Sequence, residues 1–120
     1  MCKTITMTIQ TFEEMKVWQK AKELSIITYK IFSTSKDYGF RDQIQRAAVS
    51  VMNNIAEGFE RKGNKELSRF LYISKGSCGE VRSMLQLGLE LEYISKNDFN
   101  HMHSLSIEIS KMLAGFIRAL

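Results

Sequence analysis

Hydrophobic residues recur at helical spacing in four stretches of the chain. In the first stretch, Val17, Trp18, Ala21, Leu24 and Ile31 return every three or four positions, with Ile27 or Thr28 between them. This spacing is typical of a helix that buries one face. The same pattern predicts helices over residues 11–32, 40–59, 64–93 and 95–120.

Polar residues mark the expected start of three of these helices. Thr11 with Glu14 and Ser95 with Asp98 have the spacing of a capping box, in which the first side chain accepts from a free backbone N–H. Asn64 follows a glycine and is expected to cap the third helix.

The connections between the expected helices are short, and the chain contains no proline. Short connections favour antiparallel neighbours, and the absence of proline leaves every helix interior unbroken. The sequence therefore predicts an all-α, up-down-up-down antiparallel four-helix bundle, a single domain over residues 11–120. Residues 1–10 are expected to form an N-terminal arm, extended or disordered, because Thr4 to Ile9 alternate with period two.

Two of the helices carry more apolar surface than one core requires. Residues 40–59 contain a first stripe from Ile44 to Ile55 and a second stripe beside it, so this helix is either the centre of an irregular bundle or part of a subunit interface. The third helix likewise has apolar residues off its main stripe. The predicted interface residues are Val49, Met52, Ala56, Phe59, Ile73, Met84, Leu87 and Leu91.

Positive charge is concentrated in one segment. The 120-residue chain has 17 Lys and Arg against 13 Asp and Glu, a formal net charge of +4. Between residues 61 and 75, five basic residues accompany the single acidic residue Glu66. Such a segment is either a solvated helix face or a surface for phosphates, with Tyr72 available to stack on an unpaired base. The predicted nucleic-acid-binding residues are Arg61, Lys62, Lys65, Arg69, Tyr72 and Lys75.

A polar set follows one side of the second helix and is assigned a structural role. Arg46, Asn54 and Glu57 belong to it, and Arg46 is within reach of Glu80 on the next helix. The set forms either a solvated face or a hydrogen-bonded seam between helices or subunits.

Residues with catalytic or metal-binding spacing are lacking. His101 and His103 are two positions apart and point to different faces of a helix, and Cys2 and Cys78 form no metal-ligand or redox motif. We therefore expect no enzyme activity, no metal and no cofactor. The N-terminus lacks the apolar run of a signal peptide, and no stretch is long enough to span a membrane, so a cytoplasmic location is expected.

Four segments resemble a known family. They are 12–21 (FEEMKVWQKA), 43–51 (QIQRAAVSV), 54–58 (NIAEG) and 69–77 (RFLYISKGS). In this order they are similar to the bacterial four helix bundle proteins, which include proteins encoded in intervening sequences of 23S ribosomal RNA genes and the accessory variability protein of diversity-generating retroelements. The resemblance implies a homopentamer of four-helix bundles with a basic surface linked to nucleic acid.

Two functions follow from these observations. The first is a homo-oligomer that binds nucleic acid, most simply structured RNA, through phosphates. The second is a scaffold that docks a partner protein on its apolar faces and has no direct nucleic-acid role.

Overall fold

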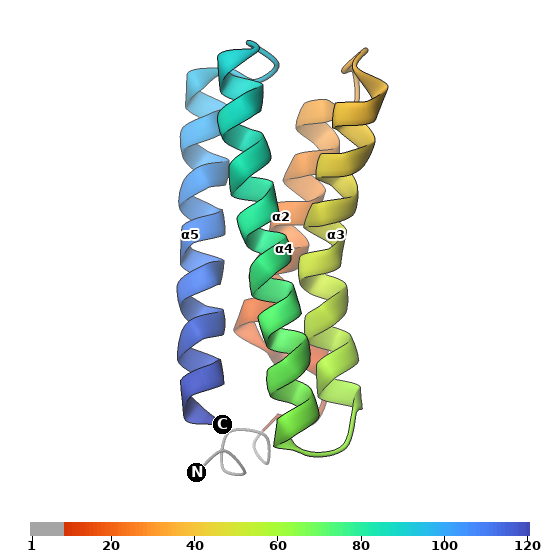
Figure 1. Ribbon diagram of the computed structural model, residues 1–120, viewed down its shortest axis with the longest axis vertical. Coiled ribbons are helices and arrows are strands. Elements are labelled where there is room, and N and C mark those ends of the chain that lie inside the picture. Colours follow the sequence, from red (N-terminus) through yellow and green to blue (C-terminus); the bar gives the residue numbers. More distant parts are fainter. Residues whose placement is uncertain (1–8) are drawn as a thin grey trace.

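The computed structural model describes residues 9–120, which form a short 3-10 helix and four α-helices (Figure 1). The elements are η1 (Phe12–Glu14), α2 (Lys16–Phe32), α3 (Tyr38–Glu60), α4 (Asn64–Glu90) and α5 (Lys96–Ala119). Consecutive helices run antiparallel, and α2 also packs against α5, so the four helices enclose one core. The predicted all-α four-helix bundle is confirmed.

The expected N-terminal arm falls mostly on residues 1–8, which lie outside the described residues, as does Cys2. Ile9, at the described end of this segment, is partly buried against the core.

The core contains the apolar stripes that the sequence predicts. In the second half of α2, however, the buried face is shifted by one residue. Ile44, Val51 and Ile55 of α3 are fully buried. In α2, Thr28 and Phe32 face the core while Ile27 and Ile31 are only partly buried. Thr28 can occupy this apolar position because its hydroxyl donates to the Leu24 carbonyl at 2.6 Å, which satisfies its polar atom within the helix.

The three predicted helix caps have different outcomes. Ser95 caps α5 as expected, accepting from the Asp98 N–H at 3.1 Å. The Thr11 cap is wrong: Thr11 makes no side-chain capping bond, and Glu14 instead accepts from the Gln10 N–H. The chain forms η1 there, and the first α-helix begins at Lys16.

The Asn64 cap is also wrong, because Asn64 is already the first residue of α4. Gly63 occupies the N-cap position with φ of +87°, a conformation that favours glycine, and no side chain caps the helix.

The helix α4 ends three residues earlier than the pattern predicts. Glu92 has φ of +61°, and the Tyr93 N–H donates to the Gly88 carbonyl at 2.8 Å. This is the Schellman arrangement that ends many helices. It turns the Tyr93 side chain back toward the start of α3, where its hydroxyl donates to Asp37.

Candidate nucleic-acid interface

The predicted basic residues lie on the turn between α3 and α4 and on the first half of α4. Arg61 is the C-cap residue that follows α3, Lys62 lies on the turn, and Lys65 and Arg69 follow on the first two turns of α4. All four side chains are exposed. The sequence prediction that they form one surface segment therefore agrees with their placement, although their charges are not all free.

Both arginines of this cluster are paired with carboxylates. Arg61 binds Glu57 with N–O distances of 2.9 and 3.1 Å, and Arg69 binds Glu66 at 3.2 and 3.3 Å. The hydrogen bond from Arg69 is the main reason that the pKa of the Glu66 carboxyl lies below its ordinary value. Such exposed pairs are weak, so a phosphate can compete for either guanidinium.

Phe70 holds the two arginines close together. The Arg61 and Arg69 guanidinium carbons lie 5.1 and 4.5 Å from the centre of its ring, within the range of cation–π attraction. Sequence reasoning missed this role of Phe70. The adjacency of Arg69 and Phe70 gives a partial signal, but only the tight turn at Gly63 brings Arg61 to the same ring.

The lysines of the segment differ from its arginines in their contacts. Within residues 9–120, Lys62, Lys65 and Lys75 form no ion pair. Lys62 and Lys65 flank the N-terminus of α4, whose first backbone N–H groups have no side-chain cap. A hollow of about 210 Å³ lies at the same turn and is lined in part by Arg61, Gly63 and Asn64. Uncapped N–H groups and the helix dipole favour anions at this place.

The local charge is smaller than the sequence count suggests. Glu57 and Glu60 lie in the last turn of α3, next to the basic segment. A window that begins at residue 61 omits both carboxylates. The turn therefore carries both positive and negative side chains, and the lysines account for its excess of positive charge.

The predicted interface residues do not share one environment. Ile73 and Leu87 of α4 are exposed by 42 and 51%, and Leu91, the residue after α4, is exposed by 46%. Met52 and Phe59 of α3 are partly buried against the core, and Val49 and Ala56 are also half-buried. Met84 was included wrongly, because it is only 8% exposed and belongs to the core.

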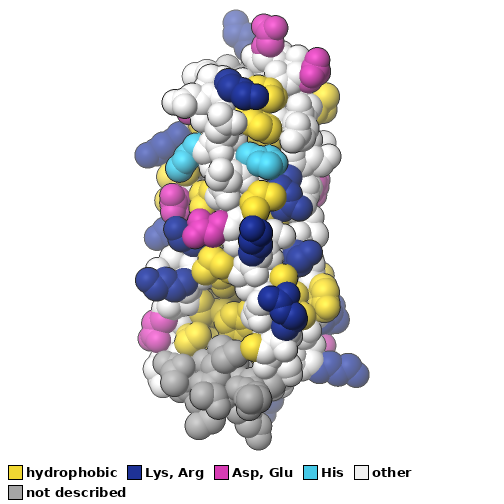
Figure 2. All heavy atoms as spheres, turned by 90° about the vertical axis from the view of Figure 1, so that its left-hand side faces the viewer, with side chains coloured by type: hydrophobic (Ala, Val, Ile, Leu, Met, Phe, Trp, Pro, Cys, Tyr) yellow, Lys and Arg dark blue, Asp and Glu magenta, His cyan; other side chains and the backbone are white. Residues whose placement is uncertain are grey.

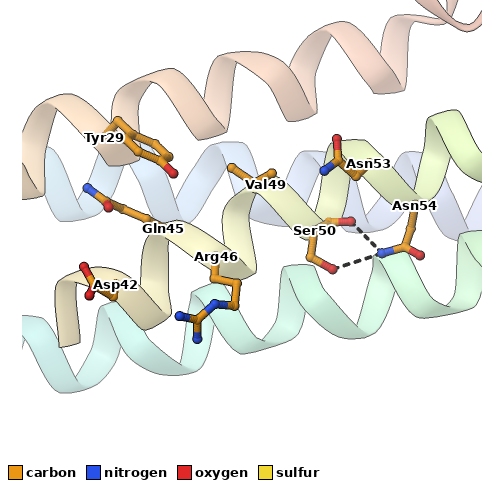
Figure 3. Close-up of a pocket in the computed structure, with 8 residues that line it drawn as sticks. All are labelled: Tyr29, Asp42, Gln45, Arg46, Val49, Ser50, Asn53 and Asn54. Atoms are coloured by element: carbon orange, nitrogen blue, oxygen red, sulfur yellow. Dashed lines mark hydrogen bonds between the residues drawn. The ribbon is translucent and has the colours of Figure 1, made fainter. Parts of the chain in front are cut away.

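The polar side of α3 forms hydrogen bonds within the bundle. Asn54 donates to the Ser50 carbonyl and hydroxyl at 2.8 and 2.9 Å, and the Ser50 hydroxyl bonds that of Ser77 on α4 at 2.8 Å. Figure 3 shows the Asn54 amide turned toward Ser50 along the helix. This part of the expected seam is present between α3 and α4.

The expected pair between Arg46 and Glu80 is not formed. Glu80 accepts from Gln43 at 3.3 Å instead, and Arg46 makes no ion pair with a described residue. Arg46 is exposed and lines a hollow of about 560 Å³ together with Tyr29 of α2 and Asn53 (Figure 3). Glu57, also a member of the polar set, pairs with Arg61.

The described residues offer little for catalysis. No group of three or more His, Cys, Asp or Glu among residues 9–120 could hold a metal ion, and Figure 2 shows the two histidines as separate side chains on the α5 side. Burial raises the pKa of the Cys78 thiol, which also donates to the Ser106 carbonyl at 3.2 Å. A buried thiol of this kind is a poor nucleophile at neutral pH. None of the described helices combines the length and apolar character needed to cross a membrane.

Comparisons with known proteins place this fold and sequence in a family. A crystal structure at 1.70 Å of a protein of unknown function from the S23 ribosomal protein family of Bacteroides thetaiotaomicron VPI-5482 superposes with a TM-score of 0.80. The two sequences are 26% identical, and the match covers 84% of this chain and 97% of that one. No protein of curated function matches the sequence. The family model described as "23S rRNA-intervening sequence protein" matches residues 13–115. The chain belongs to this 23S rRNA-intervening sequence protein family.

Proposed function

We propose that this protein is a non-enzymatic, homo-oligomeric RNA-binding protein of the cytoplasm that contacts RNA phosphates at the α3–α4 turn. The observation that carries the proposal is the position of two exposed lysines without ion pairs, Lys62 and Lys65, on either side of the α4 N-terminus, which no described side chain caps. Phosphate oxygens bind both kinds of group. The family description, which refers to 23S rRNA, supports RNA as the nucleic acid.

Arg61 and Arg69 extend this contact surface. Their carboxylate partners are exposed, so an RNA phosphate can replace Glu57 or Glu66 at small cost. Tyr72 and Lys75 lie further along α4. Binding that depends mainly on phosphates has little sequence preference and weakens steeply with salt.

We further propose that the subunits associate through two apolar surfaces. One consists of the exposed residues Ile73 and Leu87 of α4 with Leu91 at its C-terminal end, and the other is the half-buried stripe of α3. The stripe consists of Val49, Met52, Ala56 and Phe59. The pentamer implied by the resemblance is the expected assembly. Repetition of one weak RNA contact around such an assembly would raise the total affinity.

The RNA contact is tested by charge reversal at the two lysines. Lys62→Glu with Lys65→Glu should weaken binding to a structured RNA and reduce the slope of log affinity against log salt by about 0.7 to 0.9 for each lost contact. Lys30→Glu with Lys111→Glu is the matched control, because both lysines are exposed and lie on other helices. Equal affinity and slope in wild type and the first double variant would refute the site.

The scaffold remains a second candidate because Leu87 and Leu91 expose about half of their surface. The double variant Leu87→Glu with Leu91→Glu distinguishes self-association from docking of a partner protein, with the particle mass measured by light scattering. Loss of the oligomer supports self-association at this surface. An unchanged particle mass in the variant, together with no RNA binding by wild type at low salt, would favour a partner protein there.

A further inference from the structure

Tyr72 is an exposed aromatic residue without specific contacts in the described bundle. It is 61% exposed, more than the other tyrosines, and within residues 9–120 it makes no hydrogen bond or ring contact. Tyr93, in contrast, donates its hydroxyl to Asp37 and packs on Phe40. The Tyr72 ring is therefore available to a molecule outside the bundle.

Gly76, one helical turn after Tyr72, is also unexplained by packing. A glycine in a helix interior costs about 0.5 to 1 kcal/mol relative to alanine. At Gly58 and Gly88 close packing explains the glycine, since a Cβ at these positions would lie 2.7 Å from Phe70 Cβ and 3.0 Å from Phe40 Cζ, respectively. A Cβ at Gly76 would meet no atom of residues 9–120 within 4 Å, and the residue is exposed.

Helix geometry places the open backbone beside the free ring. Residues four apart lie on the same face, and side chains lean toward the helix N-terminus. A side chain at position 76 would therefore lie toward Tyr72, so glycine leaves that side of the ring uncovered.

Positive charge lies on both sides of this gap. Arg69 and Lys75 are each three residues from Tyr72, about 4.5 Å along the helix axis. The Arg69 guanidinium is bound to Glu66 and lies over Phe70, and a phosphate beside Tyr72 would replace that weak, exposed ion pair. An exposed ring between cations matches the arrangement that binds single-stranded nucleic acid, where bases stack on aromatic side chains and cations follow the backbone.

We propose that Tyr72 and the open backbone at Gly76 form a stacking site for an unpaired nucleobase of RNA. This inference rests on the proposed RNA binding and names its substrate class: RNA with a single-stranded loop or end. Bases inside a duplex are stacked on both faces and cannot enter the site. Arg69 and Lys75 contact the phosphates on either side of the stacked base.

The test compares an unpaired RNA with a duplex of equal phosphate number. Tyr72→Ala should weaken binding of the unpaired RNA roughly 5- to 100-fold and leave the duplex affinity unchanged, whereas Tyr72→Phe should retain both affinities. Gly76→Leu should reproduce the loss, because leucine covers the ring and is a good helix former. A 2-aminopurine in the unpaired strand should lose fluorescence on binding wild type and not on binding Tyr72→Ala.

The outcomes separate this inference from the proposed function. If wild type binds neither RNA at low salt, the proposed function fails and the stacking site with it. If wild type binds both RNAs and Tyr72→Ala binds each of them with the same affinity as wild type, only the stacking site is refuted. A change in particle mass of Gly76→Leu without RNA would show that the gap contacts another protein subunit, which also overturns the inference.

Discussion

The α2–α3 and α4–α5 connections lie at the same end of the bundle (Figure 1). At this end Tyr93 donates to Asp37 and packs on Phe40, whereas Tyr72, in the first half of α4, makes no ring contact with a described residue. Asp37 serves both turns, since it also accepts from the Phe40 N–H at 3.1 Å. We call these regions the closed end (Asp37, Phe40, Gly88, Tyr93) and the open face (Lys65, Arg69, Tyr72, Gly76).

The glycines differ in the same way. Gly88 lets Phe40 approach the α4 backbone, while no described residue lies within 4 Å of a Cβ built at Gly76. Equivalent residue types thus stabilise the fold in one region and remain available to solvent in the other. Residues without an internal task are the better candidates for binding, and this difference directs attention to the open face.

The largest expected effect is the loss of an aromatic ring at the closed end. Phe40→Ala should lower the free energy of unfolding by about 3 to 5 kcal/mol, because Phe40 packs on Phe32, Tyr93 and the Gly88 backbone. Tyr72→Ala should change it by no more than about 0.5 kcal/mol. Urea unfolding measures both, and equal losses would abolish the distinction between the two regions.

Alanine at two glycines should give effects of opposite sign. Gly58→Ala should destabilise the fold by about 1 to 3 kcal/mol, since the new methyl group overlaps Phe70 Cβ. Gly76→Ala should stabilise it by about 0.5 to 1 kcal/mol, because it lies in an open helical position. A destabilised Gly76→Ala monomer would mean that Gly76 has a packing role in the subunit after all.

The closed end should also confer a pH dependence on stability. Hydrogen bonds from Tyr93 and from the Phe40 N–H lower the pKa of Asp37, so its contribution is present above the ordinary carboxyl pKa and is lost as pH falls below about 4. The bond to Asp37 raises the pKa of Tyr93, so that contribution is lost as pH rises above about 10.

Tyr93→Phe isolates these contributions from those of other carboxyls such as Glu66. The difference in urea midpoint between wild type and Tyr93→Phe should be greatest near neutral pH and should shrink toward both extremes. A difference that stays constant from pH 3 to 11 would show that the hydroxyl acts through packing alone.

The smallest expected effect concerns the carboxylates beside the open face. Glu57→Gln with Glu66→Gln releases Arg61 and Arg69 and should raise RNA affinity about two- to fivefold, since exposed ion pairs are weak. Glu13→Gln with Glu23→Gln, on exposed residues at η1 and α2, controls for net charge. An equal rise in both double variants would mean that total charge, and not these pairs, sets the affinity.

Periodicity was a reliable guide to the helices and a poor one to their ends. The cap at Ser95 was predictable because its partner Asp98 lies three residues away. The cap at Thr11 was not, because η1 intervenes and Met15 becomes the residue before α2. The early end of α4 depends on the left-handed conformation of Glu92, which a residue other than glycine rarely signals.

The candidate site was predictable only as a set of residues. The sequence placed Arg61 through Lys75 on one segment, but it could not assign Arg61 to Glu57, or Glu80 to Gln43 in place of Arg46. Met84 illustrates the same limit for the apolar residues, since the packing of the neighbouring helices decides which sides of α4 are covered.

The sequence by itself determined the four helices and the stripes that form the core, because apolar spacing and the absence of proline act locally along the chain. Only the tertiary structure decided which groups remain unused. Tyr93 and Tyr72 are the same residue type on α4 or just after it, and Gly88 and Gly76 are both within α4. Their roles differ because α3 brings Asp37 and Phe40 to the first of each pair and no described residue to the second.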